Sequence, residues 1–374
     1  MHRMRILHLV GRSQRRGAET AALELAHELD ALGHDNRVRA CAPAFDGTRD
    51  RDLPPLVARP GMAPVDLGVT VVALARELRS RPVDVVLAHG GWAAQVAALA
   101  PARPSPVVVW QRILGFTPNI WSRRRRRWWS FVARRIDAAV ALTSDLGAEV
   151  RGLGLRGPVF EIPNFRRPER FLDVDRARAG KELRDEIGVT EDAALLGLVG
   201  HLIQQKRPER ALDVLARVRA VNPRAHLVVA GDGPLHGRFV QEARALGVAS
   251  AVHVLGHRAD VEQILGGIDL LLLTSDAEGI PGVLIEAQMA GCPIVTFPIG
   301  SVAAVVDDGR TGVVVAERDT RLMADHVLAL LESPSDRARL GDAARRASAR
   351  FRADSAAREY DRHLRELVAT RRTR

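Results

Sequence analysis

Two carboxylates bracket a turn and a helix start in the second half of the sequence. Glu278 and Glu286 lie eight positions apart, and Gly279, Pro281 and Gly282 between them keep side chains away from the backbone. The first turn of a helix carries unpaired N–H groups and a partial positive charge, which together favour anions. Carboxylates on either side of such a turn suit a ligand that is anionic in its middle and rich in hydroxyls at both ends. A nucleotide sugar, with ribose, diphosphate and hexose in that order, has this chemistry.

The donors at this helix start are expected to be backbone amides. They belong to Gly282, Val283 and Leu284, and Ile280 and Pro281 lead into the turn. Each glutamate has a simpler explanation when it is taken alone, because the first could be a solvated loop residue and the second an ordinary residue on a helix surface. The run as a whole favours the ligand site.

These residues need a strand before the turn and another after the helix to hold them in place. The apolar run Leu270–Leu273 predicts the first strand, and Pro293–Phe297 predicts the second. Short apolar runs alternate with helical periodicity along most of the chain, which is typical of parallel α/β folds. At 374 residues the sequence is long enough for two domains, each with its own core.

Basic residues are concentrated in the first half of the chain. The formal net charge is +10, and arginine supplies nearly all of the base, since Lys181 and Lys206 are the only lysines. Residues 1–165 contain 24 Arg/Lys against 15 Asp/Glu, whereas residues 166–374 contain 31 against 30. The first half is therefore expected to meet an acidic partner, such as an anionic membrane surface, a phosphorylated acceptor or nucleic acid.

The composition excludes several classes of protein. Hydrophobic residues make up 47% of the chain and charged residues 27%, which is typical of a soluble globular protein. Cys41 and Cys292 lie far apart in the sequence, which argues against a disulfide or thiol chemistry. No apolar run reaches the length of a membrane-spanning helix, and the N-terminus has no cleavage-site pattern. We expect a cytoplasmic protein, peripheral at the inner face of the membrane if it meets lipid.

A second distinctive stretch, SRRRRRWWSFVARR, covers residues 122–135. Folded as a helix, it would carry a band of arginines beside Trp128, Trp129 and Phe131. The segment Arg123–Arg135 thus has the pattern of a helix that lies on an anionic membrane surface. A solvated arginine face with aromatics in the core is one alternative. A nucleic-acid surface is another, although no nucleic-acid motif accompanies the segment.

Other residues with a possible chemical role follow predicted strands. The loop GHLIQQKRP contains His201, Lys206 and Arg207, and a lysine in this arginine-rich chain suggests a point contact between a compact ammonium and phosphate oxygens. Gly17 opens a helix after the first strand and its loop, which is another arrangement that can bind phosphate. His89 ends a strand at the edge where open parallel sheets place ligands, so it is either a catalytic residue or a structural histidine.

The run EGIPGVLIE from Glu278 to Glu286 closely resembles the E-x7-E segment of glycosyltransferase family 4, whose members are retaining enzymes of the GT-B fold. The loop with Lys206 resembles the family's G-R-L-x-x-x-K element and has His201 in place of the arginine. The loop at Gly17 resembles the family's G-G-x-E element. The resemblance covers most of the chain.

Three positions depart from the family pattern. Arg16 replaces the first glycine of the G-G-x-E element. Gln111 stands where the family commonly has a histidine that contacts the donor sugar, and Ala304 stands where it often has a glutamate. The departure at Arg16 bears on how closely the backbone can approach a ligand there, and the departure at Gln111 bears on how the donor sugar is positioned.

The resemblance implies an α/β fold of two doubly wound, Rossmann-like domains that face a cleft. The expected division is an acceptor-binding domain at 1–165, a linker at 166–190, a nucleotide-sugar-binding domain at 191–350, and a C-terminal helix at 351–374 that crosses back to the first domain.

The resemblance also implies retaining transfer of a sugar from a UDP- or GDP-sugar to an acceptor hydroxyl, with no metal and no other cofactor. The acceptor would be a glycan, a glycolipid or a small molecule, in the synthesis of cell-envelope glycolipid, polysaccharide or glycoconjugate. Glu278 would bind hydroxyls of the sugar and Glu286 those of the ribose, while Lys206 and the amides of residues 283 and 284 would hold the diphosphate. Arg258 lies in a turn like the family's L-G-x-x-x-D-V and would either flank the base or be an ordinary surface arginine.

Two other readings stay open. One is a sugar-nucleotide epimerase or a phosphorylase of the same fold, which the reaction products would separate from a transferase. The other is a non-catalytic basic protein that binds nucleic acid or anionic lipid, which salt-sensitive binding without turnover would indicate.

Overall fold

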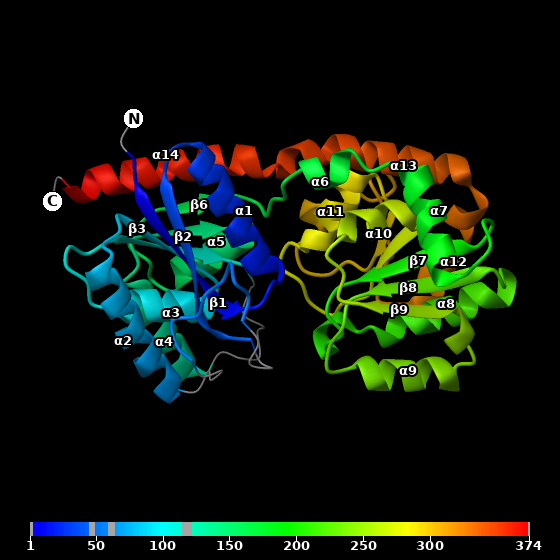
Figure 1. The fold of residues 1–374 in the computed structure, drawn as a ribbon, viewed down its shortest axis with the longest axis horizontal. Helices are drawn as coiled ribbons and strands as arrows, with labels where there is room; N and C mark the ends of the chain where they lie inside the picture. The colour runs from blue at the N-terminus through cyan, green and yellow to red at the C-terminus, as the bar shows by residue number, and fades with distance from the viewer. Residues whose placement is uncertain (1–2, 45–48, 59–63, 114–121, 373–374) are drawn as a thin grey trace. The chain divides into compact units, whose positions relative to one another are not determined.

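The computed structural model describes residues 3–44, 49–58, 64–113 and 122–372. Contacts between residues divide the chain into two compact units (Figure 1). Unit 1 contains Met1–Arg166 and Ala353–Arg374, and unit 2 contains Arg167–Arg352. Each unit is built on a parallel sheet of six strands, and this confirms the predicted α/β class with two doubly wound sheets.

The sheet of unit 1 has the strand order β2-β1-β3-β4-β5-β6, and every neighbouring pair is parallel. Its strands are β1 (Arg5–Ser13), β2 (Asp35–Pro43), β3 (Val85–His89), β4 (Val107–Arg112), β5 (Ala138–Ala141) and β6 (Val159–Glu161). Its helices are α1 (Gly17–Ala31), α2 (Pro64–Ser80), α3 (Gly91–Leu99), α4 (Arg123–Ala133), α5 (Ser144–Gly152) and α14 (Ala353–Arg372).

Both faces of this sheet are buried, because successive residues of a strand point to opposite sides. Val86 and Val108 belong to an apolar cluster with residues of helices α2 to α5. Val85 and Val107, one position earlier, belong to a second cluster with residues of helices α1 and α14. This two-sided burial explains why the strands read as continuous apolar runs in the sequence.

Unit 2 has the strand order β12-β11-β10-β7-β8-β9, again with parallel neighbours. Its strands are β7 (Ala194–Val199), β8 (Ala225–Ala230), β9 (Val252–Gly256), β10 (Leu270–Leu273), β11 (Ile294–Thr296) and β12 (Val313–Val314). Its helices are α6 (Glu169–Leu172), α7 (Arg176–Ile187), α8 (Glu209–Val221), α9 (His236–Ala245), α10 (Val261–Gly267), α11 (Gly282–Ala290), α12 (Thr320–Glu332) and α13 (Pro334–Ala347).

The strand order locates the ligand edge of unit 2. The chain leaves β7 toward β8 on one side and later returns to β10 on the other, so the order reverses between β7 and β10. Open parallel sheets bind ligands outside the carboxyl ends of the strands at such a point. The loops that follow β7 and β10 contain Lys206 and Glu278.

The segment expected as a linker, 166–190, differs in the structure from that expectation. From residue 167 onward it is part of unit 2, with helices α6 and α7. Ala179 and Leu183 of α7 are buried against the backbone of Gly267 in α10, where an added Cβ would lie 2.8 Å from the Ala179 carbonyl oxygen. Charged residues surround this narrow apolar face of α7, so the face is difficult to recognise in the sequence.

Helix α14 groups with unit 1 and packs beside α1. Tyr360 and Leu364 of α14 are about 1% exposed and lie in the same apolar cluster as Ile6 and Leu25. At the polar margin, Asp361 contacts His34 with an O–N distance of 2.7 Å. The C-terminal helix therefore completes the core of unit 1.

We expect Tyr360→Ala to destabilise unit 1 by about 3 kcal/mol, because removal of a large buried aromatic leaves a cavity that the sheet cannot fill. Chemical denaturation of the full chain would measure this change. Glu359→Ala, at an exposed position on the same helix, is the matched control and should change little. Equal effects of the two substitutions would contradict the proposed contribution of α14 to the core.

Candidate functional site

The loop after β7 and the loop after β10 are joined by hydrogen bonds. The Thr274 hydroxyl donates to the carbonyl oxygens of Lys206 at 3.2 Å and Arg207 at 3.1 Å. The Asp276 amide donates to the Gln205 carbonyl at 2.8 Å, and the Gln205 side-chain amide donates to the carbonyl of residue 277 at 2.7 Å. These bonds hold the two loops in one register at the ligand edge of the sheet.

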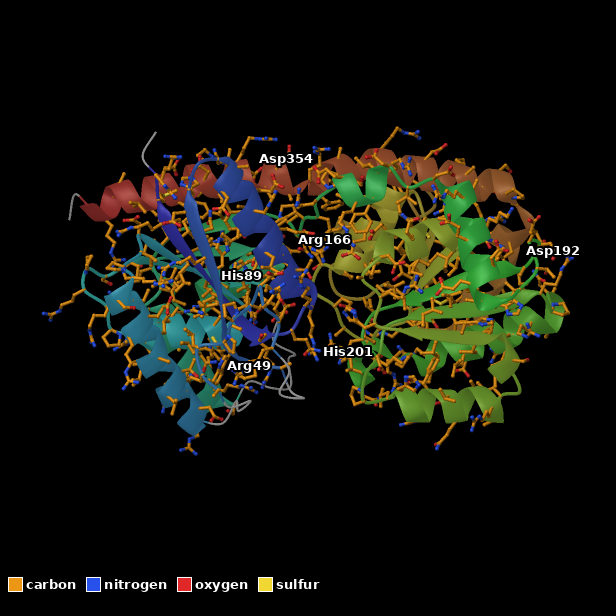
Figure 2. The ribbon with its side chains drawn as sticks, viewed as in Figure 1. Arg49, His89, Arg166, Asp192, His201 and Asp354 are labelled. Carbon is orange, nitrogen blue, oxygen red and sulfur yellow. The ribbon has the colours of Figure 1, made fainter. Side chains whose placement is uncertain are left out.

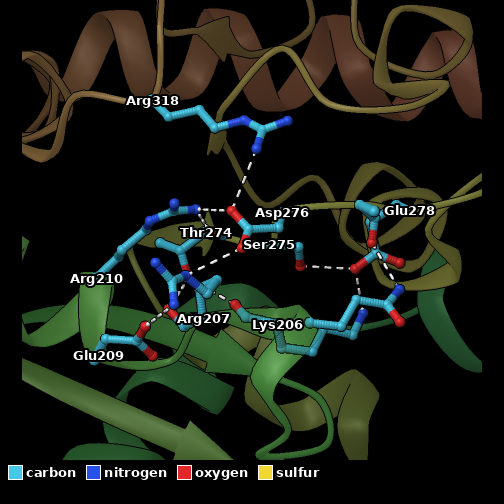
Figure 3. A network of polar contacts seen from close by, with 11 residues as sticks. Lys206, Arg207, Glu209, Arg210, Thr274, Ser275, Asp276, Glu278 and Arg318 are labelled. Carbon is cyan, nitrogen blue, oxygen red and sulfur yellow. Dashed lines mark hydrogen bonds and ion pairs between the residues drawn. The ribbon is translucent and has the colours of Figure 1, made fainter. Parts of the chain in front are cut away.

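An ion pair forms where the joined loops meet. The Lys206 ammonium lies 2.6 Å from Oε1 of Glu278, and the Ser275 hydroxyl donates to the same oxygen at 2.7 Å (Figure 3). The side chain of Glu278 is 9% exposed and that of Lys206 is 24% exposed. A largely buried carboxylate needs such partners, because burial of a lone charge is costly. The structure therefore brings together two residues that the sequence predicted for one site.

Arg207 and Lys206 are adjacent in sequence, but their side chains have different partners. Arg207 has a left-handed backbone conformation with φ of 49°, and its guanidinium pairs with Asp276 at 3.2 Å and Glu209 at 3.1 Å. Figure 3 shows the Lys206 side chain directed to Glu278 and that of Arg207 directed to the other two carboxylates. The expected contact of Arg207 with the ligand has no support in this arrangement.

Asp276 is the centre of a second polar cluster. Besides Arg207, it accepts from Arg210 at 2.8 Å and from Arg318 at 3.3 Å (Figure 3). Arg210 also donates to the Thr274 carbonyl at 3.0 Å. The cluster fixes the turn that carries Glu278.

Helix α11 begins beside this turn, at the position that the sequence predicted. Pro281 occupies the N-cap without a side-chain cap, and the first turn contains no acidic residue. The Leu284 amide donates to the Pro281 carbonyl at 3.2 Å, so Leu284 is not one of the amides left for an anion. The amides of Gly282 and Val283 remain, because the first amides of a helix have no acceptor within it. Ile280, 4% exposed, anchors the turn in the core.

The helix itself is held firmly. Its residues are buried on most sides, and the Gln288 side chain donates to the Val305 carbonyl at 2.7 Å. Glu286 lies in the second turn with its side chain partly exposed. The position of the helix start is therefore set by packing along the whole helix.

Two glycines allow other loops to approach the site. Gly300 has φ of +49°, and a Cβ there would lie 2.1 Å from the carbonyl oxygen of Glu278. Gly231 has φ of +150°, and a Cβ there would lie 1.9 Å from the carbonyl oxygen of Gly200. A side chain at either position would displace the loop of Glu278 or the loop of Lys206.

His201 lies at the start of the Lys206 loop and is partly exposed (Figure 2). Its neighbour Leu202 donates its amide to the Asp232 carbonyl at 3.0 Å. A hydrogen bond from the Gly233 amide lowers the pKa of Asp232, and the nearby side chains of His236 and His201 act in the same direction. His201 thus has an acidic residue close by on the β8 loop.

Arg258 is bound by acidic residues of unit 2. Its guanidinium pairs with Asp260 at 2.6 Å and with Glu186 of α7. Hydrogen bonds to Asp260 and Glu186 raise the pKa of Arg258. It joins α7 to the loop after β9, and the expected role beside a nucleotide base has no support in these contacts.

His89 lies inside unit 1 rather than at its surface (Figure 2). It is 2% exposed, its Nε2 lies 3.1 Å from Nδ1 of His8, and its Nδ1 contacts the side-chain oxygen of Gln111. His8 in turn lies 3.0 Å from Asn36. Burial lowers the pKa of His89 to about 3 and that of His8 to about 4, so both rings are neutral at physiological pH. The expected catalytic role of His89 has no support in these contacts, because its side chain is buried and both ring nitrogens have partners inside unit 1.

The first loop of unit 1 contains Gly17 at the first position of α1. The residue does not have a positive φ, and an added Cβ would find no atom within 4 Å. Neither the backbone nor the packing within the described residues therefore requires a glycine there. Glu19, two residues later, is 8% exposed, and burial raises its pKa.

Helix α4 divides the aromatic residues of the arginine-rich stretch. Trp129 is buried and stacks on Trp110 with ring centroids 5.2 Å apart, and Trp128 donates to the Gln95 side chain at 2.6 Å. Phe131 is 40% exposed. The arginines at 123–127 are all exposed, and none forms an ion pair with an acidic residue in the described part of the chain. The alternative of core aromatics is therefore right for Trp129.

No group of three or more His, Cys, Asp or Glu side chains within the described residues is placed to hold a metal ion. No helix among them is both long enough and apolar enough to cross a bilayer.

Ser275, Asp276 and Gly300 contribute to the site but were not predicted from the sequence. Ser275 and Asp276 stand in an ordinary polar turn after an apolar strand, and Gly300 stands in a later loop. Their role depends on contacts with residues of other loops or of the same turn, and the spacing of residues in the sequence does not reveal these contacts. The conspicuous signal was the turn sequence Thr274–Glu278 itself, which is short and follows a fully buried strand.

Two family models match the chain. The model of glycosyl transferases group 1 matches residues 180–347, and the model of glycosyltransferase family 4 matches residues 15–170. The chain is also 30% identical over 323 residues to a glycogen synthase of Mycobacterium tuberculosis, with 82% of this chain and 75% of that protein covered.

Other relatives match over shorter stretches. A D-inositol 3-phosphate glycosyltransferase of Catenulispora acidiphila is 33% identical over 217 residues, which is 54% of this chain. The match spans 51% of that relative, so the chain covers about half of its length. Among solved structures, Anabaena HepE in complex with UDP and glucose has a TM-score of 0.81 at 22% identity, with 97% of this chain and 100% of that one covered. At 22% identity, the similarity to HepE shows a shared fold.

We expect Gly300→Ala to lower the melting temperature of the chain more than Gly309→Ala does. Both glycines have positive φ, but a Cβ at Gly309 meets nothing within 4 Å, whereas one at Gly300 meets the Glu278 carbonyl. The control therefore carries only the conformational cost of a left-handed alanine, about 1 kcal/mol. Thermal unfolding of both variants would measure the difference. Equal shifts would show that the loops do not depend on this approach.

Proposed function

We propose that this chain, which belongs to the glycosyltransferases of group 1 and family 4, transfers a sugar from a nucleotide-diphosphate sugar to an acceptor hydroxyl. One observation supports this most directly. The Lys206–Glu278 pair lies at the ligand edge of unit 2, beside the uncapped start of α11. A cation, helix amides and a carboxylate are the groups that a diphosphate joined to a sugar requires.

Each group has a separate part in the proposed reaction. Lys206 and the amides of Gly282 and Val283 would hold the diphosphate and stabilise its charge as it departs. Glu278 would accept hydrogen bonds from sugar hydroxyls, and Glu286 from those of the ribose. His201 would lie near the phosphates, on the same loop as Lys206.

The proposed step conserves atoms and configuration. The bond between the anomeric carbon and the phosphate oxygen breaks while a bond to the acceptor oxygen forms on the same face of the sugar. The proton of the acceptor hydroxyl passes to a phosphate oxygen of the leaving group. This route needs no protein base, and it agrees with the burial of His89.

The relatives suggest a donor and a class of acceptor. HepE structures hold UDP with glucose and UDP-glucose, which supports a uridine nucleotide as the donor. Relatives named for inositol 3-phosphate, glycogen and Vi polysaccharide support a hydroxyl-rich acceptor, either a glycan or a phosphorylated small molecule. An epimerase or phosphorylase of the same fold would give different products from the same donor.

We expect Glu278→Ala to lower the rate of transfer at least tenfold while the protein stays folded. A hydrogen bond to a charged group contributes about 1.5–3 kcal/mol, which corresponds to a factor of roughly 10 to 150. A panel of UDP- and GDP-sugars, first ranked by protection against thermal unfolding, would supply the donor for the assay. Glu317→Ala, at an exposed position of unit 2, is the control. Unchanged transfer by the Glu278 variant would remove this residue from the site.

We further propose that helix α4 lies on an anionic membrane surface. Arginines in the first turn of a helix oppose the positive end of its dipole and repel one another, and α4 has no acidic residue there. An anionic surface would relieve this repulsion, and the exposed Phe131 could enter the interface. The helix follows β4, so its basic start lies at the carboxyl edge of the unit 1 sheet. A chain placed this way would act at the inner face of the membrane.

We expect replacement of all five arginines at 123–127 by serine to abolish sedimentation with phosphatidylglycerol vesicles at low salt, because each basic residue adds about 1 kcal/mol near such a surface. Vesicles of phosphatidylcholine should bind neither form. A control of equal charge replaces five exposed arginines of unit 2, which are Arg217, Arg224, Arg238, Arg244 and Arg321. Equal loss of binding in both variants would show that net charge alone is responsible and would exclude a specific role of α4.

A further inference from the structure

We propose that Ser275 is a positioning residue that fixes the carboxylate of Glu278 for the donor sugar. The inference rests on the proposed function of Glu278 and adds a residue that neither the motif nor the relatives indicate.

The two oxygens of Glu278 have different surroundings. Oε1 accepts from the Ser275 hydroxyl at 2.7 Å and lies 2.6 Å from the Lys206 ammonium. Oε2 accepts no hydrogen bond from any other described residue. A carboxylate oxygen can accept more than one hydrogen bond, so Oε2 is the atom that can receive hydroxyls of a sugar.

Ser275 is the rigid member of this group. Its side chain is completely buried, and its neighbours on both sides are bonded to the Lys206 loop, Thr274 through its hydroxyl and Asp276 through its amide. A short side chain on a fixed backbone presents its hydroxyl in one place. The orientation of Glu278 is therefore imposed by the turn that contains it.

Lys206 cannot fix the carboxylate in the same way during turnover. Its long side chain is partly exposed, and the proposed function requires its ammonium to contact the diphosphate. When the ammonium turns to the phosphates, its bond to Oε1 weakens, and Ser275 remains the donor that holds this oxygen. The hydroxyl thus keeps Glu278 oriented in the state in which the sugar is bound.

This division of roles predicts a specific pattern of losses. Removal of the Ser275 hydroxyl should weaken interactions with the sugar but not those with the nucleotide diphosphate. Removal of the Lys206 ammonium should weaken the diphosphate contact. A hydroxyl that served only to stabilise the fold would affect both ligands alike.

The experiment is a double-mutant cycle on the full chain with Ser275→Ala, Glu278→Gln and both together. The donor is the UDP- or GDP-sugar that protects the wild type best, and the comparison ligand is the matching nucleoside diphosphate without sugar. We expect Ser275→Ala to lower kcat/KM about tenfold, to leave the Kd of the nucleoside diphosphate unchanged within twofold, and to add less than twofold on the Glu278→Gln background.

Three further variants complete the test. Ser348→Ala removes another buried hydroxyl of unit 2, one that donates to the Arg345 carbonyl at 2.7 Å, and it should leave kcat/KM unchanged. Lys206→Ala should raise the Kd of the nucleoside diphosphate. Ser275→Cys keeps a short side chain with a weaker donor and should give an intermediate rate, which preserves the test if the alanine variant fails to fold.

Additive losses in the cycle would overturn the role of Ser275, as would an equal loss of affinity for the nucleoside diphosphate. A wild-type chain that neither binds nor turns over any donor of the panel would instead contradict the proposed function. The two failures are thus distinguishable.

Discussion

The contact between Lys206 and Glu278 joins two loops whose residues are separated by 72 positions in the chain. Each side chain helps to place the other, because burial of a carboxylate is less costly beside a cation and a long ammonium is less mobile with a partner. Hydrogen bonds from Thr274, Asp276 and Gln205 hold the loops in the register in which the two charges meet. The parallel sheet makes this meeting reachable, since β7 and β10 are neighbours and both loops leave its carboxyl edge.

The surplus of arginine in this chain makes selective pairing necessary. Arg207, Arg210 and Arg318 are all drawn to Asp276, which leaves Lys206 as the cation that faces Glu278. The two acidic residues of this turn therefore differ in role. Asp276 fixes the turn through its arginine partners, and Glu278 is the carboxylate proposed to bind the sugar. A similar use of acidic partners binds Arg258 between α7 and the loop after β9.

In unit 1, by contrast, polar residues near a sheet edge are buried. His8, His89 and Gln111 are buried together, and their mutual contacts satisfy groups that would otherwise be costly inside the core. Helix α14 covers this side of the sheet through Tyr360. Positive charge is displayed instead on α4, whose arginines stay in solvent while Trp129 anchors the helix in the core.

The α/β class, the strands Leu270–Leu273 and Ile294–Thr296 and the start of α11 could be predicted from the sequence, because apolar periodicity and glycine or proline breaks are local signals. The sequence also singled out Glu278 and Lys206. That Lys206 rather than Arg207 faces Glu278 became visible only in the fold, since φ of 49° at Arg207 and the position of Asp276 turn that guanidinium elsewhere. The same is true of the burial of His89 and of the packing of residues 167–190 into unit 2. Burial and pairing depend on residues distant in the chain, and no local pattern encodes them.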